Sequence, residues 1–272
     1  MNSELNKKLQ KLEEIFKSMK KVLVAFSGGV DSTFLLKVAR DTLGDDHVLA
    51  VTALSPLYPE RELKGAEKMV GEIGARHLLI VSNELEINGF SKNPTNRCYF
   101  CKSELFQELW KVAQKEKIPF IVEGSTLDDQ KDHRPGREAV RELKIRSPLI
   151  EASFSKADVR EVSQSMGLPT WDKPSFACLA SRFPYGEEIT AEGLRMVNEA
   201  EEFLIGLGFK QVRVRHYQHL ARIEIFKEEI SRLLDEALRE KIVQGLKKIG
   251  YYYITLDLQG FRSGSMNEVL TG

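Results

Sequence analysis

The chain has 272 residues, of which 42% are hydrophobic, and this suffices for one large domain or two domains of unequal size. Charged residues make up 29% and cancel, with 40 Lys and Arg against 40 Asp and Glu, whereas proteins that grip nucleic acid usually carry a basic excess. Ordinary apolar content and only 3 cysteines exclude disordered and disulfide-scaffold classes. No apolar run suits a membrane span or a signal peptide, so we expect a soluble, cytoplasmic protein without nucleic-acid or membrane partners.

The first part of the chain alternates between helical and strand patterns. Apolar residues three and four apart predict a helix over the first twenty residues. Short apolar runs then predict strands at 21–26, 47–52, 77–81 and 119–123, separated by helices at 33–43, 59–74 and 102–117. Strands joined through helices indicate βαβ units and an α/β fold with a parallel sheet. A charged loop with a short helix at 137–143, and a Ser-capped helix at 155–166, are expected to follow.

The pattern changes after residue 170. Residues 170–188 contain two prolines and a glycine and show no period, which predicts a long functional loop or linker. Beyond it we expect helices at 190–207 and 227–249 and strands at 212–215, 221–225 and 251–258. Alternation with polar outer faces indicates a small, partly antiparallel sheet. We therefore predict one domain over 1–183 and a smaller C-terminal α/β domain over 184–272.

A glycine-containing loop between the first strand and the next helix suits phosphate. The start of a helix offers free N–H donors and a positive dipole end to an anion, and glycines let the backbone approach phosphate oxygens closely. The two serines add hydroxyl donors, and the aspartate is a candidate ligand for Mg²⁺. The alternative is a glycine turn with a capping serine, but the whole string after an apolar strand favours phosphate binding. Its residues are Ser27, Gly28, Gly29, Val30, Asp31 and Ser32.

The three cysteines form a pattern suited to metal or sulfur chemistry, and their odd number argues against a closed disulfide framework. Cys98 and Cys101 make a C-x2-C pair just ahead of an expected helix, and Cys178 lies in the long loop. Three thiolates suit an iron–sulfur cluster with one iron left open, or zinc with a histidine as fourth ligand. The alternative is three unrelated buried thiols, because Cys packs well as a small hydrophobe.

The phosphate loop resembles the PP-loop of N-type ATP pyrophosphatases, which have an adenine nucleotide alpha hydrolase-like fold and adenylate a substrate with release of pyrophosphate. The resemblance implies that Ser27–Ser32 holds the pyrophosphate and that Thr52 and Ala53, on the next strand, help to hold the adenine. Gly124 and Asp128 follow another strand end, where parallel sheets build their sites, and are expected to contribute to nucleotide or Mg²⁺ binding. The alternative for Asp128 is that it caps a helix.

Four further segments are similar to the ATP-dependent sacrificial sulfur transferase family, LarE. They follow the family's order across nearly the whole chain and are residues 123–129, 134–139, 169–182 and 260–268. The resemblance implies an enzyme with a small nucleotide substrate, which uses ATP to adenylate a carboxylate of pyridinium-3,5-biscarboxylic acid mononucleotide. That carboxylate becomes a thiocarboxylate on the way to the nickel-pincer nucleotide cofactor. Family members form trimers or hexamers, so a homo-oligomer is expected.

Two sulfur sources occur in that family. In one, a single cysteine at the position of Cys178 gives up its own sulfur and becomes dehydroalanine. In the other, three cysteines hold a 4Fe–4S cluster whose open iron carries an extra sulfide. This sequence has Cys98 and Cys101 besides Cys178, so the resemblance favours the cluster, and the sacrificial cysteine remains the alternative.

Arginines in the second part of the chain are candidates for binding the substrate. Arg213 and Arg215 alternate on an expected strand, so both point to one face, where paired guanidiniums suit a phosphate. From the residues by themselves, a strand edge with solvated charges is the stronger alternative. The resemblance implies that Arg213, Arg215 and Arg262 bind the phosphate and carboxylates of the substrate, and we include Arg182, which ends the segment around Cys178.

Three other functions fit parts of this pattern. A tRNA-thiolating PP-loop enzyme also uses cluster cysteines, but it should show a basic surface or an added RNA-binding element. A non-catalytic nucleotide and iron–sulfur sensor would bind ATP without releasing pyrophosphate. A zinc-clipped, amidotransferase-like synthetase is the weakest of the three.

Overall fold

The computed structural model describes residues 3–130, 135–174, 176–262 and 264–270. Arg134, Ser175 and Ser263, which belong to the segments that carry the family resemblance, lie outside the described residues. The chain divides into two compact units: an N-terminal unit of 1–83 and 96–176, and a C-terminal unit of 84–95 and 177–272. The sequence placed the division at residue 183, whereas the structure divides the chain at 176 and takes 84–95 into the C-terminal unit.

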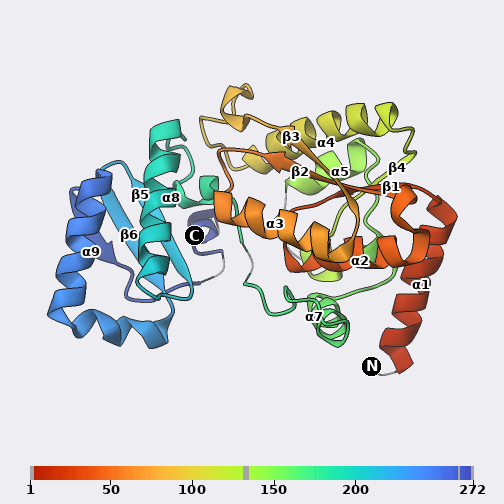
Figure 1. Cartoon of the computed structure of the whole chain (residues 1–272). Coiled ribbons are helices and arrows are strands. Elements are labelled where there is room, and N and C mark those ends of the chain that lie inside the picture. The colour runs from red at the N-terminus through yellow and green to blue at the C-terminus, as the bar shows by residue number, and fades with distance from the viewer. Residues whose placement is uncertain (1–2, 131–134, 175, 263, 271–272) are drawn as a thin grey trace. The chain divides into compact units, whose positions relative to one another are not determined.

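The N-terminal unit is built on a parallel sheet. Its described part has four strands in the order β3-β2-β1-β4, all parallel, which confirms the predicted α/β fold (Figure 1). The strands are β1 (Val22–Ala25), β2 (Val48–Leu54), β3 (Arg76–Val81) and β4 (Phe120–Val122). Because β1 lies between β2 and β4, the loops that follow these three strands meet at one edge of the sheet.

Helices cover both faces of this sheet. Val22 and Val24 of β1 point into a core with α1, α2, α3 and α7, whereas Leu23 points into a second core with α4. This alternation follows from the two-residue period of a strand, and Figure 1 shows α2 with α3 on one side and α4 with α5 on the other. The helices are α1 (Ser3–Met19), α2 (Val30–Leu43), α3 (Glu60–Ile73), α4 (Arg97–Lys115), α5 (Gly136–Glu142), α6 (Pro148–Glu151) and α7 (Lys156–Ser165).

The C-terminal unit contains a small mixed sheet. Its described strands have the order β5-β6-β7, with β5 (Val212–Tyr217) and β6 (Leu220–Ile225) antiparallel and β7 (Tyr253–Leu256) parallel to β6. The helices α8 (Ala191–Gly206) and α9 (Glu236–Ile249) share one core with Val212 and Val214 of β5. Arg213 and Arg215 alternate with these valines and therefore lie on the opposite face of the sheet.

Several predicted boundaries were wrong. The helix expected from residue 102 begins five residues earlier, at Arg97, so that residues 97–101 form the first turn of α4. The single helix expected over 227–249 is a 3-10 segment, η5 (Lys227–Leu234), followed by α9, and the Asp235 carboxylate caps α9 by accepting from the Leu238 amide at 2.7 Å. The short helix α6 was not predicted.

Residues 84–95 belong to the C-terminal unit through hydrogen bonds that the sequence did not indicate. The buried Asn93 side chain donates to the carbonyls of Phe183 at 3.2 Å and Pro184 at 2.6 Å. The Ile189 amide donates to the Ser91 carbonyl at 2.8 Å. Residues 84–95 therefore form hydrogen bonds with residues 183–189, which follow Arg182 in the chain.

Candidate functional site

The phosphate loop connects β1 to α2 and leaves the start of that helix open. Gly29 is the N-cap of α2, and no side chain caps the helix there in the described structure. The Ser27 and Ser32 hydroxyls lie 3.1 Å apart. Uncapped amides at a helix start, flanked by hydroxyls, form a site for phosphate oxygens.

Both the backbone conformation and the close packing at position 28 require a glycine. Its φ is +68°, in the left-handed region that favours glycine. A Cβ at this position would lie 2.8 Å from Cβ of Ala66 and 2.9 Å from its Cα, on α3. The loop is therefore seated directly against the α3 backbone.

Asp31 combines burial with an incompletely satisfied carboxylate. Its Oδ2 forms an ion pair with Lys156, whereas its buried Oδ1 has no hydrogen-bond partner among the described residues. Burial raises the pKa of Asp31, and the nearby Lys156 ammonium opposes that effect. An orphaned carboxylate oxygen beside a phosphate loop fits Mg²⁺, whose preferred ligands are oxygens. Asp31 is thus suited to hold Mg²⁺.

A pocket of about 110 Å³ opens beside the phosphate loop. Ser27, Thr52 and Ala53, which the sequence analysis singled out, are among its lining residues. The Thr52 hydroxyl donates to the Phe26 carbonyl at 2.9 Å, and Nε2 of His77 lies 2.9 Å from the same hydroxyl. Apolar walls with a polar edge suit a planar base such as adenine.

Gly124 and Asp128 approach the same loop from β4. A Cβ at Gly124 would lie 3.1 Å from the Ser32 nitrogen, so its backbone abuts the first turn of α2. Asp128 accepts a hydrogen bond from the Lys156 amide at 2.6 Å, which is the first residue of α7. Asp128 therefore satisfies an amide in the first turn of α7, whose N-cap is Ser155.

Cys98 and Cys101 lie in the first turns of α4 rather than ahead of it, which corrects the sequence expectation. Residues three apart on a helix share one side, so both thiols can face one group. Cys98 is exposed and Cys101 is partly exposed. A Cβ at Gly136 of α5 would lie 3.2 Å from the Cys98 carbonyl, so α5 supports this end of α4.

Cys178 lies in the C-terminal unit, immediately before the 3-10 turn η4 (Leu179–Arg182). Its carbonyl accepts hydrogen bonds from the Ser181 amide at 3.0 Å and from Nη1 of Arg182 at 3.2 Å. Its side chain is partly exposed. Among the residues that the structure describes, no group of three or more His, Cys, Asp or Glu is placed to hold a metal ion.

Two of the four candidate arginines form buried ion pairs. The Arg182 side chain is 0% exposed and donates from Nε and Nη2 to Glu201 at 2.8 and 2.9 Å. Burial would raise the pKa of Glu201, but the Arg182 guanidinium holds it below its ordinary value. Arg215, also buried, donates to both Glu224 carboxylate oxygens, at 2.9 and 2.6 Å. Arg215 is therefore not a solvated charge on a strand edge, which was the alternative that the sequence favoured.

The other two candidates differ in exposure. Arg213 is buried, with its guanidinium 5.4 Å from the centre of the Phe261 ring. Arg262 is partly exposed and donates from Nε to Glu268 at 3.0 Å. The carboxylates of Glu224 and Glu268 thus balance part of the positive charge in this unit.

Comparison with known proteins decides the family. Residues 3–102 match the NAD synthase family. The chain is 46% identical to an uncharacterized protein of Synechocystis sp., over 98% of this chain and 99% of that protein. It is 38% identical to the pyridinium-3,5-bisthiocarboxylic acid mononucleotide synthase of Lactiplantibacillus plantarum, over 94% and 92% of the two chains. The chain belongs to the LarE family. An uncharacterized protein of Methanocaldococcus jannaschii is also similar, at 32% identity over 93% of this chain and 94% of that protein.

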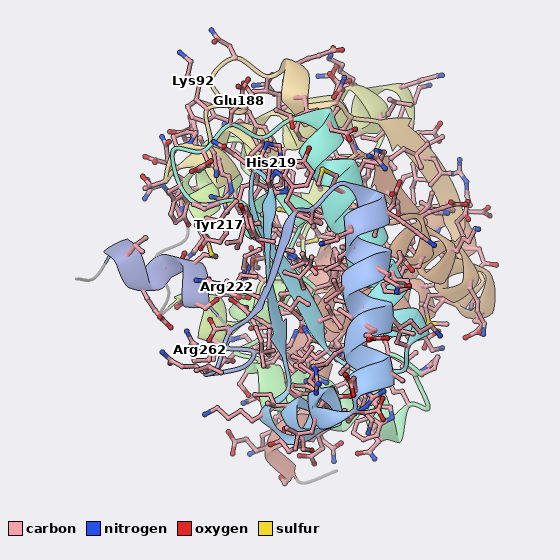
Figure 2. All side chains as sticks on the ribbon, turned by 90° about the vertical axis from the view of Figure 1, so that its left-hand side faces the viewer. Lys92, Glu188, Tyr217, His219, Arg222 and Arg262 are labelled. Carbon is pink, nitrogen blue, oxygen red and sulfur yellow. The ribbon has the colours of Figure 1, made fainter. Side chains whose placement is uncertain are left out.

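Three residues that the sequence did not single out lie beside candidate site residues of their own unit. Lys156 pairs with Asp31, and Nζ of Lys173 donates to the Gly28 carbonyl at 3.1 Å. On β6, Arg222 lies over the Tyr217 ring at 5.4 Å, and Figure 2 shows both on one face of the C-terminal unit with Arg262. A useful sequence signal was available for Lys173, because it lies in the 169–182 segment that resembles the family.

We expect Lys173→Met to weaken ATP binding by about tenfold, or about 1.4 kcal/mol. Lys173 bridges the Gly28 carbonyl and, at 2.8 Å, the Glu62 carboxylate, so its loss frees the loop and removes a positive charge beside the phosphates. Calorimetric titration with ATP and Mg²⁺ measures the change. Lys68→Met on α3 is the matched control, since its ion pair with Glu72 is 3.8 Å long and its side chain is 75% exposed. Equal affinities in the two variants would contradict the assignment.

No helix in the described part of the chain is long and apolar enough to cross a membrane.

Proposed function

We propose that this LarE-family chain converts a carboxylate of pyridinium-3,5-biscarboxylic acid mononucleotide into a thiocarboxylate, for biosynthesis of the nickel-pincer nucleotide. The chain is an ATP-dependent sulfurtransferase. The observation that carries the proposed substrate is the 38% identity, over nearly the full length of both chains, to the synthase of Lactiplantibacillus plantarum. The phosphate loop, the adjoining pocket and Cys178 supply the groups that such a reaction needs.

The first step is adenylation of the substrate. A substrate carboxylate oxygen attacks the α phosphorus of ATP, the bond from that phosphorus to the bridging oxygen breaks, and pyrophosphate leaves. The uncapped start of α2 and the Ser27 and Ser32 hydroxyls bind the leaving pyrophosphate, where negative charge develops. Asp31, whose Oδ1 has no hydrogen-bond partner among the described residues, would hold Mg²⁺, and that ion would neutralise negative charge on the phosphates.

The second step is sulfur transfer to the acyl carbon, with AMP as the leaving group. A carboxylate resists a sulfur nucleophile, and adenylation overcomes this by converting its oxygen into a good leaving group. We propose that Cys98, Cys101 and Cys178 hold a 4Fe–4S cluster, which supplies a replaceable sulfide when bound. The exposed Cys98 thiol and the partly exposed Cys101 thiol, three residues apart on α4, suit that donor set.

We propose that the substrate phosphate and carboxylates are bound by Arg213, Arg215 and Arg262 of the C-terminal unit. Arg262 is the most accessible of the three, with a side chain that is 26% exposed. Arg222 is next to this group, and its buried Nε has no hydrogen-bond partner in the described residues. We further propose that the protein acts in the cytoplasm as a trimer or hexamer, with the N-terminal unit as the adenylating domain and the C-terminal unit as the domain for substrate and assembly.

One experiment tests the reaction and the sulfur source together. The protein is purified without oxygen, assayed for iron and sulfide, and incubated with ATP, Mg²⁺ and the pyridinium dicarboxylate nucleotide. Release of pyrophosphate with thiocarboxylate formation, iron in stoichiometric amount and an unchanged intact mass are the expected results. An intact mass lower by the mass of H₂S at Cys178 would show that Cys178 gives up its own sulfur, and would contradict the cluster as the sulfur source. No substrate-dependent pyrophosphate would contradict the proposed function and favour a nucleotide sensor.

A further inference from the structure

The backbone around Cys178 is held by a guanidinium that is closed off from solvent. Nη1 of Arg182 donates to the carbonyls of Ala177 at 2.8 Å and Cys178 at 3.2 Å, and lies 2.7 Å from the Ser181 hydroxyl. The Arg182 side chain has 0% exposure, so these contacts are made in a low-dielectric interior. Three of its contacts thus fall within the five residues from Ala177 to Ser181.

The other edge of the same guanidinium is fixed by Glu201 of α8. Both Glu201 oxygens accept from Arg182, and Oε1 also accepts from the Val214 amide of β5 at 3.0 Å. The Glu201 side chain is 0% exposed. Through Arg182, the Glu201 carboxylate therefore connects residues 177–181, called here the Cys178 turn, to α8 and β5 of the C-terminal unit.

A second buried pair holds the far end of the turn. Nη1 of Arg215 donates to the Ser181 carbonyl at 3.0 Å, while its other nitrogens bind Glu224. The carbonyls at both ends of the turn thus accept from arginines that are themselves paired with buried glutamates. A reactive group held from two directions loses little conformational entropy at the moment of reaction.

We propose that Arg182, oriented by Glu201, is a positioning residue that fixes the backbone of Cys178 for sulfur transfer. This rests on the role of Cys178 in the proposed function. Arg182 is grouped by sequence with the substrate-binding arginines, but its guanidinium has no surface for a ligand. It acts through the Cys178 backbone instead, so its loss should uncouple adenylation from sulfur transfer rather than prevent adenylation.

The test compares two variants with a matched control. Arg182→Met together with Glu201→Gln removes both charges of the pair, keeps an acceptor for the Val214 amide, and leaves neither partner of the pair as a buried ion without the other. Arg182→Lys keeps the positive charge for Glu201 but cannot also reach both carbonyls. The control is Arg195→Met with Glu199→Gln, which removes an exposed 2.7 Å ion pair from the same helix, α8.

Two quantities are measured for each protein: hydrogen exchange of the Ser181 amide, which donates to the Cys178 carbonyl, and thiocarboxylate formed per pyrophosphate released. Both Arg182 variants should exchange faster and lose at least about tenfold in this ratio, because a small misplacement of a reacting group is costly. The control should match the wild type. Pyrophosphate release itself should change little in all of them.

Three results would overturn the assignment or separate it from the proposed function. If Arg182→Lys forms as much thiocarboxylate per pyrophosphate as the wild type, the pair is not a positioning device. The same conclusion follows if the double variant shows faster exchange of the Ser181 amide but an unchanged ratio of thiocarboxylate to pyrophosphate. If the wild type releases pyrophosphate without forming thiocarboxylate, the proposed function fails. In that case, unchanged exchange and an unchanged rate of Cys178 alkylation in the Arg182 variants would overturn the positioning role independently.

Discussion

Cys178→Ser should abolish thiocarboxylate formation, by at least about 1,000-fold, while ATP and the substrate still yield pyrophosphate. A hydroxyl is a far weaker nucleophile than a thiolate and a poor ligand for iron, so either sulfur source is lost. The adenylating groups lie in the N-terminal unit, whereas Cys178 lies immediately before the η4 turn of the C-terminal unit. Mass spectrometry of the nucleotide product, with a coupled pyrophosphate assay, measures both steps.

Cys98→Ser and Cys101→Ser separate the two sulfur sources. If three thiolates hold a cluster, each variant loses iron and thiocarboxylate formation together. If Cys178 donates its own sulfur, both variants retain one turnover per chain. Thiocarboxylate formation by Cys178→Ser at the wild-type rate would contradict both readings. All three changes are small, and each thiol is at least partly exposed, so the fold should tolerate them.

Gly28→Ala should reduce pyrophosphate release by about 100-fold, or about 2.7 kcal/mol. A non-glycine residue at a φ of +68° costs about 1–2 kcal/mol. The added Cβ would also lie within 3.0 Å of two atoms of Ala66, one of them on the α3 backbone, and overpacking of this kind costs about 1–3 kcal/mol. The loop must shift away from α3, which misplaces its amides relative to the phosphates. Steady-state kinetics with ATP measures the loss.

Gly44→Ala is the matched control for this variant. Gly44 also has a positive φ, +83°, but a Cβ there would meet nothing within 4 Å. It should therefore lower the unfolding temperature through backbone strain and leave pyrophosphate release unchanged. Comparable kinetic losses in the two variants would show that strain, and not the seat of the loop on α3, accounts for the effect.

Most of the N-terminal fold could be predicted because its signals are local. A run such as Lys21–Phe26 must be buried on both faces, and the helices between such runs show a clear apolar period. The capping box of α7 was equally readable, with Ser155 and Asp158 accepting from each other's amides at 2.8 and 3.2 Å. The start of α4 was missed because Arg97–Cys101 carries no apolar period to mark it.

The candidate site was predictable only where a motif carries its own chemistry. The phosphate loop names its ligand through glycines and hydroxyls at a helix start, and the three cysteines indicate sulfur or metal chemistry by number and spacing. Lys156 gave no such signal, because a single lysine has the same appearance on a surface or beside a phosphate, and Lys173 is marked only by its place in the 169–182 segment that resembles the family. Their contacts with Asp31 and Gly28 span more than 100 residues of sequence.

The sequence by itself determined the α/β class, the phosphate loop and the three thiols, since each depends on the order of neighbouring residues. Only the tertiary structure decided what the arginines contact. Arg182 and Arg215 are as charged in the sequence as Arg195, yet they are buried against Glu201 and Glu224, whereas Arg195 is solvated. The balanced charge count hides this difference, because the energy of a charge depends on its burial and its partner, and long-range folding sets both.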